Sequence, residues 1–194
     1  MRVLIGSVLA AAVLGGCGGS GPSFKNTDIT GADYGKDFTL TDQSGKTRTL
    51  ADFRGKVVVM FFGYTRCPDV CPTTLADLKA AREQLGEDGK RVQVLFVTVD
   101  PERDTRQLLA SYVSAFDTSF LGLYGDSAAT AKVAKEFKVF YQKAPGKTPD
   151  SYTVDHTAGS YVFDTQGRLR LLVRQGNVPN LVADLKTLLG PSRG

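Results

Sequence analysis

Two cysteines and one histidine are the residues of this chain whose types and spacing could bind a metal ion or carry out redox chemistry. Cys67 and Cys71 are separated by three residues and follow an apolar run over 57–62. His156, the only histidine of the chain, lies far downstream. Two thiolates and one imidazole form a soft ligand set that suits trigonal Cu(I), and Zn²⁺ accepts the same donors with an added water. The residue types therefore predict a site for a soft metal ion, and they leave copper and zinc both open.

The same cysteine pair could instead form a disulfide bond. Helical side chains four positions apart have β-carbons roughly 5–6 Å apart, whereas a disulfide needs roughly 3.5–4.5 Å between them. A bridge between Cys67 and Cys71 would also close a short loop, so it would stabilise the fold little. The spacing thus favours metal ligation, with the Cys67–Cys71 disulfide as the oxidised state.

The third cysteine, Cys17, belongs to a separate feature at the N-terminus. An apolar stretch over 3–14 is followed by two glycines and then by Cys17. This stretch is too short for a permanent membrane span and is typical of a signal peptide, which we expect over 1–16. The residues before Cys17 resemble a bacterial lipobox, in which the cysteine becomes the lipidated N-terminus. Ordinary secretion is the alternative.

The residues after Cys17 predict a tether and then a single domain. The segment over 17–36 is rich in Gly, Ser, Thr and Asp, which is typical of a flexible linker, and 37–190 is long enough for one core. We expect a lipoprotein that faces the periplasm, an oxidising compartment. The residue directly after Cys17 is Gly18 and not an aspartate. By resemblance to Gram-negative sorting rules, this favours the outer over the inner membrane.

The charge pattern argues against a nucleic-acid partner. The formal net charge is +4, and loss of Arg2 with the signal peptide leaves about +3. Basic residues are interspersed with acidic ones, and no block of five like charges occurs. We therefore expect an ordinary solvated surface.

The apolar pattern of the domain alternates between strand and helix periodicity, which predicts an α/β fold with parallel crossovers and a late hairpin. Strands are expected at 38–40, 48–50, 56–64, 91–100, 121–124, 160–164 and 169–174. Helices are expected at 72–85, 105–116, 127–137 and 178–189.

This arrangement predicts where the cysteines lie. Cys67 would follow the C-terminal end of a central strand, and Cys71 would precede a helix whose first residue is Pro72. The positive end of the helix dipole would favour the thiolate form of both cysteines. Asp100, which precedes a proline, is expected to be a helix N-cap, and the segment 141–152, with its prolines and glycine, to be a loop.

Three motifs together carry a family resemblance. They are CPDVCP over 67–72, VDPERDT over 99–105 and YTVDHT over 152–157. In order and spacing they resemble the Sco/SenC family, over essentially all of 37–189.

The resemblance implies a thioredoxin-like fold with a central mixed sheet, flanking helices and an N-terminal β-hairpin. It implies that Cys67, Cys71 and His156 bind a copper ion, and that the protein helps to assemble the binuclear copper centre of cytochrome c oxidase. The partners would be the oxidase subunit that carries this centre and a thioredoxin-like reductase that restores the thiols. Asp155 could orient the imidazole ring by accepting its second N–H.

The competing hypothesis is an enzyme. Cys67 and Cys71 would be the redox pair of a thiol-disulfide oxidoreductase that reduces the target cysteines before another chaperone delivers copper. Against this, the spacing is CxxxC rather than CxxC, Arg66 stands where thioredoxins carry tryptophan, and the 155–157 segment lacks their proline. Metal ligation also gives His156 a role that a reductase does not require.

Overall fold

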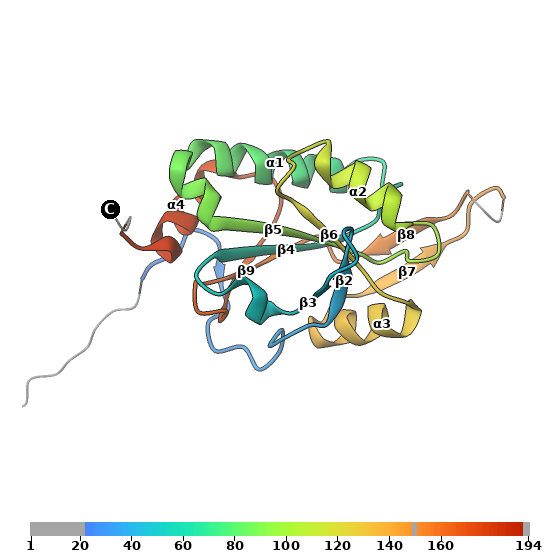
Figure 1. The fold of residues 1–194 in the computed structure, drawn as a ribbon, viewed down its shortest axis with the longest axis horizontal. Helices are drawn as coiled ribbons and strands as arrows, with labels where there is room; N and C mark the ends of the chain where they lie inside the picture. The colour runs from blue at the N-terminus through green and yellow to red at the C-terminus, as the bar shows by residue number, and fades with distance from the viewer. Residues whose placement is uncertain (1–21, 149–150, 192–194) are drawn as a thin grey trace, which may run out of the picture.

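The computed structural model describes residues 22–148 and 151–191, and its centre is an eight-stranded mixed sheet with helices on both faces (Figure 1). The order across the sheet is β1-β10-β9-β4-β5-β6-β2-β3. The strands are β1 Thr27–Asp28, β2 Leu40–Asp42, β3 Thr47–Arg48, β4 Val57–Gly63, β5 Val92–Thr98, β6 Leu121–Tyr124, β9 Ser160–Phe163 and β10 Leu169–Val173. The predicted mixed sheet and the β2–β3 hairpin are confirmed.

Helices cover the two faces of this sheet unequally. Helices α1, α2 and α4 lie on one face and α3 lies on the other (Figure 1). Their bounds, with two short 3-10 helices, are α1 Val70–Gln84, α2 Arg106–Ser114, α3 Ser127–Glu136, α4 Val178–Leu189, η1 Leu50–Phe53 and η2 Gly86–Arg91. The four helices expected from the sequence are therefore present, with ends shifted by no more than two residues.

The alternation of β4 explains how one strand serves both layers. Successive side chains of a strand point to opposite faces of the sheet. In β4, Val59 and Phe61 pack with α1, α2 and α4, whereas Met60 and Phe62 pack with α3, and all four side chains are buried. A strand that is buried on both faces has apolar residues at nearly every position, and this is the pattern of 57–62.

The parallel pairing of β4 with β5 brings two loops to one edge of the sheet. The register runs from Val57 opposite Val92 to Gly63 opposite Thr98. Both strands therefore end at the same level, and the backbone of Val99 still donates a 2.8 Å hydrogen bond to the Gly63 carbonyl. The segments that follow the two strands start side by side.

A second, two-stranded sheet extends beyond this edge. Strand β7, Tyr141–Ala144, pairs antiparallel with β8, Thr153–His156, and Tyr141 lies opposite His156. The hairpin projects from the end of the molecule opposite α4 (Figure 1). The sequence prediction of a loop over 141–152 was wrong for its first four residues, because pairing with β8 outweighs the weak strand signal of a short, exposed segment.

Part of the predicted flexible tether, within the described residues 22–36, packs on the domain. Strand β1 pairs with β10, and the backbone N–H groups of Lys25 and Asn26 donate to the buried Asp184 carboxylate at 2.7 and 2.8 Å. Packing of the chain on the domain thus begins well before residue 37. The predicted signal peptide and the lipidation site, Cys17, lie outside the described residues. Within the described part of the chain, no helix is long and apolar enough to span a bilayer.

Candidate metal centre

Cys67, Cys71 and His156 converge at the edge of the sheet where β4 and β5 end. Their potential ligand atoms all lie within 4.8 Å of one another. His156 Nε2 is 3.6 Å from Cys71 Sγ, and the backbone N–H of Cys71 donates to Cys67 Sγ at 3.4 Å. Both thiols are free. The structure therefore brings the three residues singled out in the sequence into one cluster.

The β4–α1 connection positions both sulfur atoms. The Cys67 backbone N–H donates to the Tyr64 carbonyl at 3.2 Å, which closes a tight turn directly after β4. Helix α1 starts at Val70, so Cys71 lies inside its first turn and Pro72 is its third residue instead of its first. Cys71 is fully buried, whereas Cys67 is partly exposed. One sulfur thus faces the interior and the other remains open to solvent.

His156 is held in a single tautomer suited to ligation. Its Nδ1 atom is 3.1 Å from the Thr157 carbonyl oxygen, which can only accept, so in the neutral ring Nδ1 carries the proton. Nε2 then directs its lone pair at the Cys71 thiol, 3.6 Å away, and can accept its hydrogen bond. The rings of Phe61 and Tyr64 pack against the imidazole, with centroids 6.1 and 6.0 Å away. The proposed orienting role of Asp155 was wrong, because the backbone carbonyl accepts this hydrogen bond.

Burial shifts the pKa values of two candidate ligands, the buried Cys71 and the partly buried His156. Burial raises the pKa of the Cys71 thiol, and its hydrogen bond with Cys67 adds to the shift. The prediction that the helix dipole favours a thiolate at Cys71 was therefore wrong for the metal-free protein, since desolvation outweighs the dipole. Burial also lowers the pKa of His156. A metal ion thus meets a neutral thiol and a neutral imidazole, and binding must displace the thiol proton.

A buried polar cluster lies behind the cysteine loop. Asp104 accepts hydrogen bonds from the Thr65 backbone and hydroxyl and from the Thr98 hydroxyl, the last at 2.6 Å. Burial raises the pKa of this carboxyl, with the charge of Asp100 contributing. Asp104 was not among the predicted site residues. The available signal was an acidic residue that follows a strand ending beside the cysteines.

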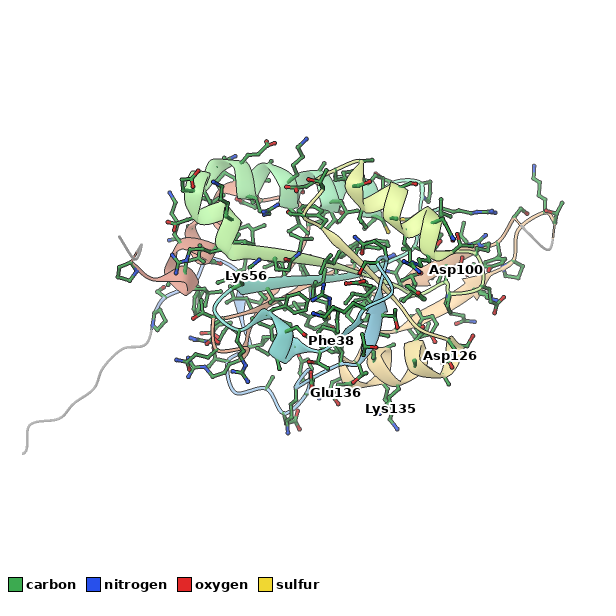
Figure 2. The ribbon with its side chains drawn as sticks, in the orientation of Figure 1. Phe38, Lys56, Asp100, Asp126, Lys135 and Glu136 are labelled. Carbon is green, nitrogen blue, oxygen red and sulfur yellow. The ribbon has the colours of Figure 1, made fainter. Side chains whose placement is uncertain are left out.

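Asp100 does not cap a helix, contrary to the prediction. Helix α2 begins later, and its N-cap is Thr105, which accepts from the Leu108 backbone at 3.2 Å. The buried Asp100 carboxylate instead binds the Arg103 guanidinium and the Tyr152 hydroxyl. Figure 2 labels Asp100 at the end of the molecule from which the β7–β8 hairpin projects. Arg103 and Tyr152 were also missed, because their contact joins segments that are distant in sequence.

Tyr112 of α2 contributes a hydroxyl group close to the cysteines. This oxygen is shielded from solvent and has no hydrogen-bond partner among the described residues. Burial raises the pKa of Tyr112, and negative charge on Cys71, Cys67 and Asp104 would raise it further. The ring packs on Phe96 at a centroid distance of 5.4 Å.

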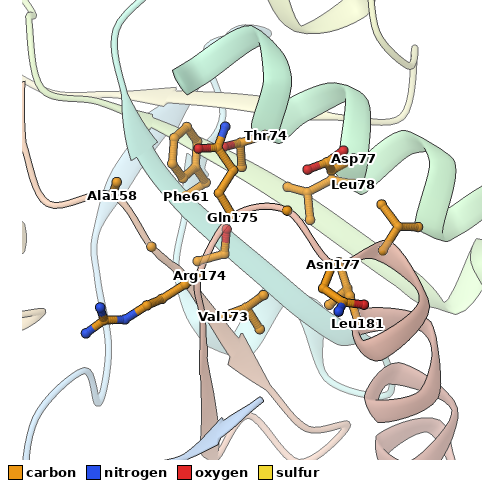
Figure 3. A pocket seen from close by; sticks show the side chains of 14 residues that line it. Phe61, Thr74, Asp77, Leu78, Ala158, Val173, Arg174, Gln175, Asn177 and Leu181 are labelled. Atoms are coloured by element: carbon orange, nitrogen blue, oxygen red, sulfur yellow. The ribbon is translucent and has the colours of Figure 1, made fainter. Parts of the chain in front are cut away.

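A small pocket lies beside the metal cluster, between α1, α4 and the turn that follows β10 (Figure 3). Phe61 lines it and also touches His156, but none of the three candidate ligands does. Its cavity volume of about 20 Å³ is enough for about one water molecule. The chemistry of the site therefore belongs to the cysteine–histidine cluster and not to this pocket.

The donor set is compatible with copper. Two sulfurs and one neutral imidazole nitrogen match the preference of Cu(I) for soft, low-coordinate sites, and their mutual distances leave room for one ion among them. Zinc would need a fourth ligand, such as water. The partly exposed Cys67 provides the open side through which an ion or another ligand can approach.

Comparison with known proteins matches this chain to the SCO1/SenC family model and to individual SCO proteins. The SCO1/SenC family model matches residues 26–190. The mitochondrial protein SCO2 homolog of Bos taurus is 43% identical over 133 residues, which are 68% of this chain and 50% of that protein. The chain thus spans about half the length of the first curated relatives it matches.

Solved structures agree in fold. Copper-bound ScoI of Bradyrhizobium japonicum is 42% identical with a TM-score of 0.74, and the match covers 81% of this chain and 99% of that one. Apo Sco1 of Thermus thermophilus is 45% identical with a TM-score of 0.77, covering 88% and 99%. The thioredoxin-like fold is confirmed. Because the family model covers nearly the whole described domain, the chain belongs to the SCO1/SenC family.

Proposed function

We propose that this protein binds one copper ion through Cys67, Cys71 and His156 and delivers it to the binuclear copper centre of cytochrome c oxidase. The observation that carries the proposal is the convergence of two free thiols and a correctly oriented imidazole at one exposed edge of the fold. The likeness to copper-bound Sco structures supports copper over zinc.

Copper is the cargo in this scheme, and unequal burial of the ligands suggests an order of transfer. Binding replaces the two thiol protons, which are released to solvent, and uses the Nε2 lone pair that faces the Cys71 thiol in the metal-free protein. Cys71 is buried and Cys67 is open. A thiolate of the recipient subunit would therefore displace Cys67 first, and Cys71 would be the last sulfur to release the ion.

The proposed cellular setting follows from the N-terminal sequence. Cleavage after residue 16 and lipidation of Cys17 would anchor the protein to a membrane on the periplasmic side. The tether would be the stretch between Cys17 and the segment at Phe24 and Lys25, which packs on the domain. In this compartment the cysteine pair can oxidise, so a thioredoxin-like reductase would restore the copper-binding form.

Thiol-disulfide reduction is the second candidate function. It is favoured by the accessible Cys67 sulfur, which receives a backbone hydrogen bond at the start of α1, with the second thiol beside it. A reductase should keep its activity in a His156→Ala variant, whereas a copper carrier should lose affinity. Turnover of a protein disulfide by the wild type, unaffected by this substitution and without copper retention, would favour the enzyme.

The proposal is tested by copper transfer from the full chain to a soluble fragment of the oxidase subunit that carries the binuclear site. We expect one copper per wild-type chain and transfer to the fragment, with both lost in Cys67→Ser and Cys71→Ser. The matched control is Cys17→Ser, which makes the same substitution away from the site. It should retain copper transfer and lose membrane association. Stoichiometric copper in either site variant would contradict the mechanism.

A further inference from the structure

The turn that follows β5 contacts both halves of the metal site. On one side, Asp104 binds the backbone and hydroxyl of Thr65, two residues before Cys67. On the other side, Arg103 and Asp100 bind Tyr152, which directly precedes the strand that carries His156. One short segment is therefore bonded to the cysteine loop and to the histidine hairpin.

Arg103, Asp100 and Tyr152 form a closed set of contacts. The Arg103 Nε atom donates to Asp100 Oδ2 at 2.5 Å, and its Nη1 donates to the Tyr152 carbonyl at 2.8 Å. The Tyr152 hydroxyl donates to Asp100 Oδ1 at 2.7 Å. The guanidinium also stacks on the Tyr152 ring, with its central carbon 3.5 Å from the ring centroid. The Asp100 side chain is fully buried and that of Arg103 is 10% exposed, so solvent screens this ion pair weakly.

These contacts matter because β8 has little other backbone support. Among the described residues, β8 pairs only with β7 and not with the eight-stranded sheet. The position of His156 relative to the cysteines therefore depends on side-chain contacts between the hairpin and the body of the domain. Val154 supplies an apolar contact, since it is buried in the core.

Arg103 also reaches the imidazole through Tyr64. The guanidinium carbon lies 5.9 Å from the centroid of the Tyr64 ring, and that ring makes a T-shaped contact with the His156 imidazole. The Tyr64 hydroxyl takes a hydrogen bond from the Val154 backbone in β8. Arg103 thus lies between two aromatic rings, one before the cysteine loop and one before the histidine strand.

We propose that Arg103 is a positioning residue for copper binding: held by Asp100, it fixes the β7–β8 hairpin through Tyr152 so that His156 stays within reach of the cysteine pair. The inference rests on the proposed function only in taking copper as the bound metal. Lysine cannot replace arginine here, because an ammonium group lacks the planar fork that stacks and donates in two directions.

The test measures copper loss from the copper-loaded full chain to an excess of a Cu(I) chelator. Loss of a partner bonded directly to a metal ligand typically costs about 10- to 100-fold in metal affinity. Arg103 acts one residue further out, through Tyr152, so we expect Arg103→Gln to accelerate copper loss by about 10-fold, the lower end of that range. Arg103→Lys should lose copper almost as fast as Arg103→Gln, because lysine cannot make the same contacts. The matched control is Lys143→Gln, which removes an exposed cation that also lies over the Tyr152 ring, 4.8 Å from its centroid. It should change the rate less than about 2-fold.

A double-variant cycle separates positioning from general destabilisation. If Arg103 acts through His156, then Arg103→Gln should have less than about a 2-fold effect in a His156→Ala background. Tyr152→Phe, which keeps the ring and removes only the hydroxyl bond to Asp100, should act in the same direction with a smaller effect. An equal acceleration in both backgrounds, or no acceleration in the wild-type background, would overturn the proposal.

A metal-free readout distinguishes failure of this inference from failure of the proposed function. The chain has one histidine, so its ring signals in NMR spectra report on His156 alone. We expect Arg103→Gln to shift or broaden these signals and Lys143→Gln to leave them unchanged. If the wild type retains no copper, the proposed function fails, and this spectrum still decides whether Arg103 positions His156. Unchanged ring signals in Arg103→Gln would contradict the inference.

Discussion

His156 Nε2 lies 3.6 Å from Cys71 Sγ, although the two residues are 85 positions apart in the chain. The cysteine belongs to the first turn of α1 and the histidine to a hairpin outside the main sheet. Neither local sequence nor a single element creates this proximity. The site exists only when the sheet edge, the helix and the hairpin are all in place, so copper binding should stabilise the folded chain as a whole.

We predict that Gly63→Ala damages the metal site. A β-carbon at Gly63 would lie 2.8 Å from Cys71 Sγ and 2.9 Å from a ring carbon of Phe96, closer than atoms in packed cores approach. The substitution should displace the sulfur and cost about 1–3 kcal/mol of stability. Copper stoichiometry and thermal unfolding, measured on the same samples, check both effects.

The control for this prediction is Gly122→Ala in β6. Its added carbon would crowd Leu109 at 3.2 Å and Val113 at 3.4 Å, in the core but on α2 instead of beside the sulfur. This variant should lose stability and keep its copper. Full copper retention by Gly63→Ala would show that the sulfur adjusts freely to the new methyl group.

Removal of a shielded tyrosine hydroxyl should change the stability of the fold in opposite directions at Tyr112 and Tyr161. The Tyr112 hydroxyl has no hydrogen-bond partner in the described part of the chain, so Tyr112→Phe should stabilise the metal-free protein by about 1 kcal/mol. The Tyr161 hydroxyl donates to the Phe137 carbonyl at 2.7 Å, and burial raises its pKa to about 12. Tyr161→Phe should destabilise by about 1–2 kcal/mol. Urea unfolding of the two variants measures both, and a loss of stability in Tyr112→Phe would indicate that its hydroxyl does have a partner.

Acid sensitivity of the fold should depend on Asp42 in the β2–β3 hairpin. Burial acts to raise the pKa of this carboxyl, but hydrogen bonds from Ser44, Arg48 and the Lys46 backbone bring it down from 3.8 to about 2. Because the folded-state pKa is the lower one, the contribution of Asp42 is fully present above about pH 4 and is lost as pH falls toward 2. The shift corresponds to about 2 kcal/mol at neutral pH.

Asp42→Asn should therefore lower stability at pH 7 and flatten the pH dependence between pH 4 and pH 2. Asp33→Asn is the control, because the Asp33 side chain is exposed and its ion pair with Lys138 contributes little. Chemical unfolding across this pH range gives the measurement. A pH profile that is unchanged in Asp42→Asn would mean that other carboxylates dominate acid unfolding.

Much of the fold could be predicted because its signals are local. The buried run of β4 and the apolar periodicity of α4 define those elements from the sequence, and α4 begins and ends at the predicted residues. The β7–β8 hairpin could not be predicted in the same way. The side chains of β7 are largely exposed, so the strand is defined by its partner and not by its own pattern.

In the candidate site, too, features set by local sequence could be predicted, and features that depend on contacts between distant segments could not. The candidate ligands could be singled out by residue type, since soft donors are few in this chain and only one imidazole exists. The partners of the ligands could not be predicted. The hydrogen bond from His156 goes to a backbone carbonyl, which leaves no trace in residue identity. The bonding of Asp104 to Thr65 depends on the parallel register of two strands.

The most direct test of the central claim is the copper content of the reduced, anaerobically purified chain, compared between wild type and His156→Ala under a competing Cu(I) chelator. We expect one copper per wild-type chain and at least about a 10-fold weaker hold in the variant, because one of three ligands is removed. Equal retention by both proteins would show that His156 is not a ligand. A wild type that keeps no copper would contradict the copper-carrier account itself.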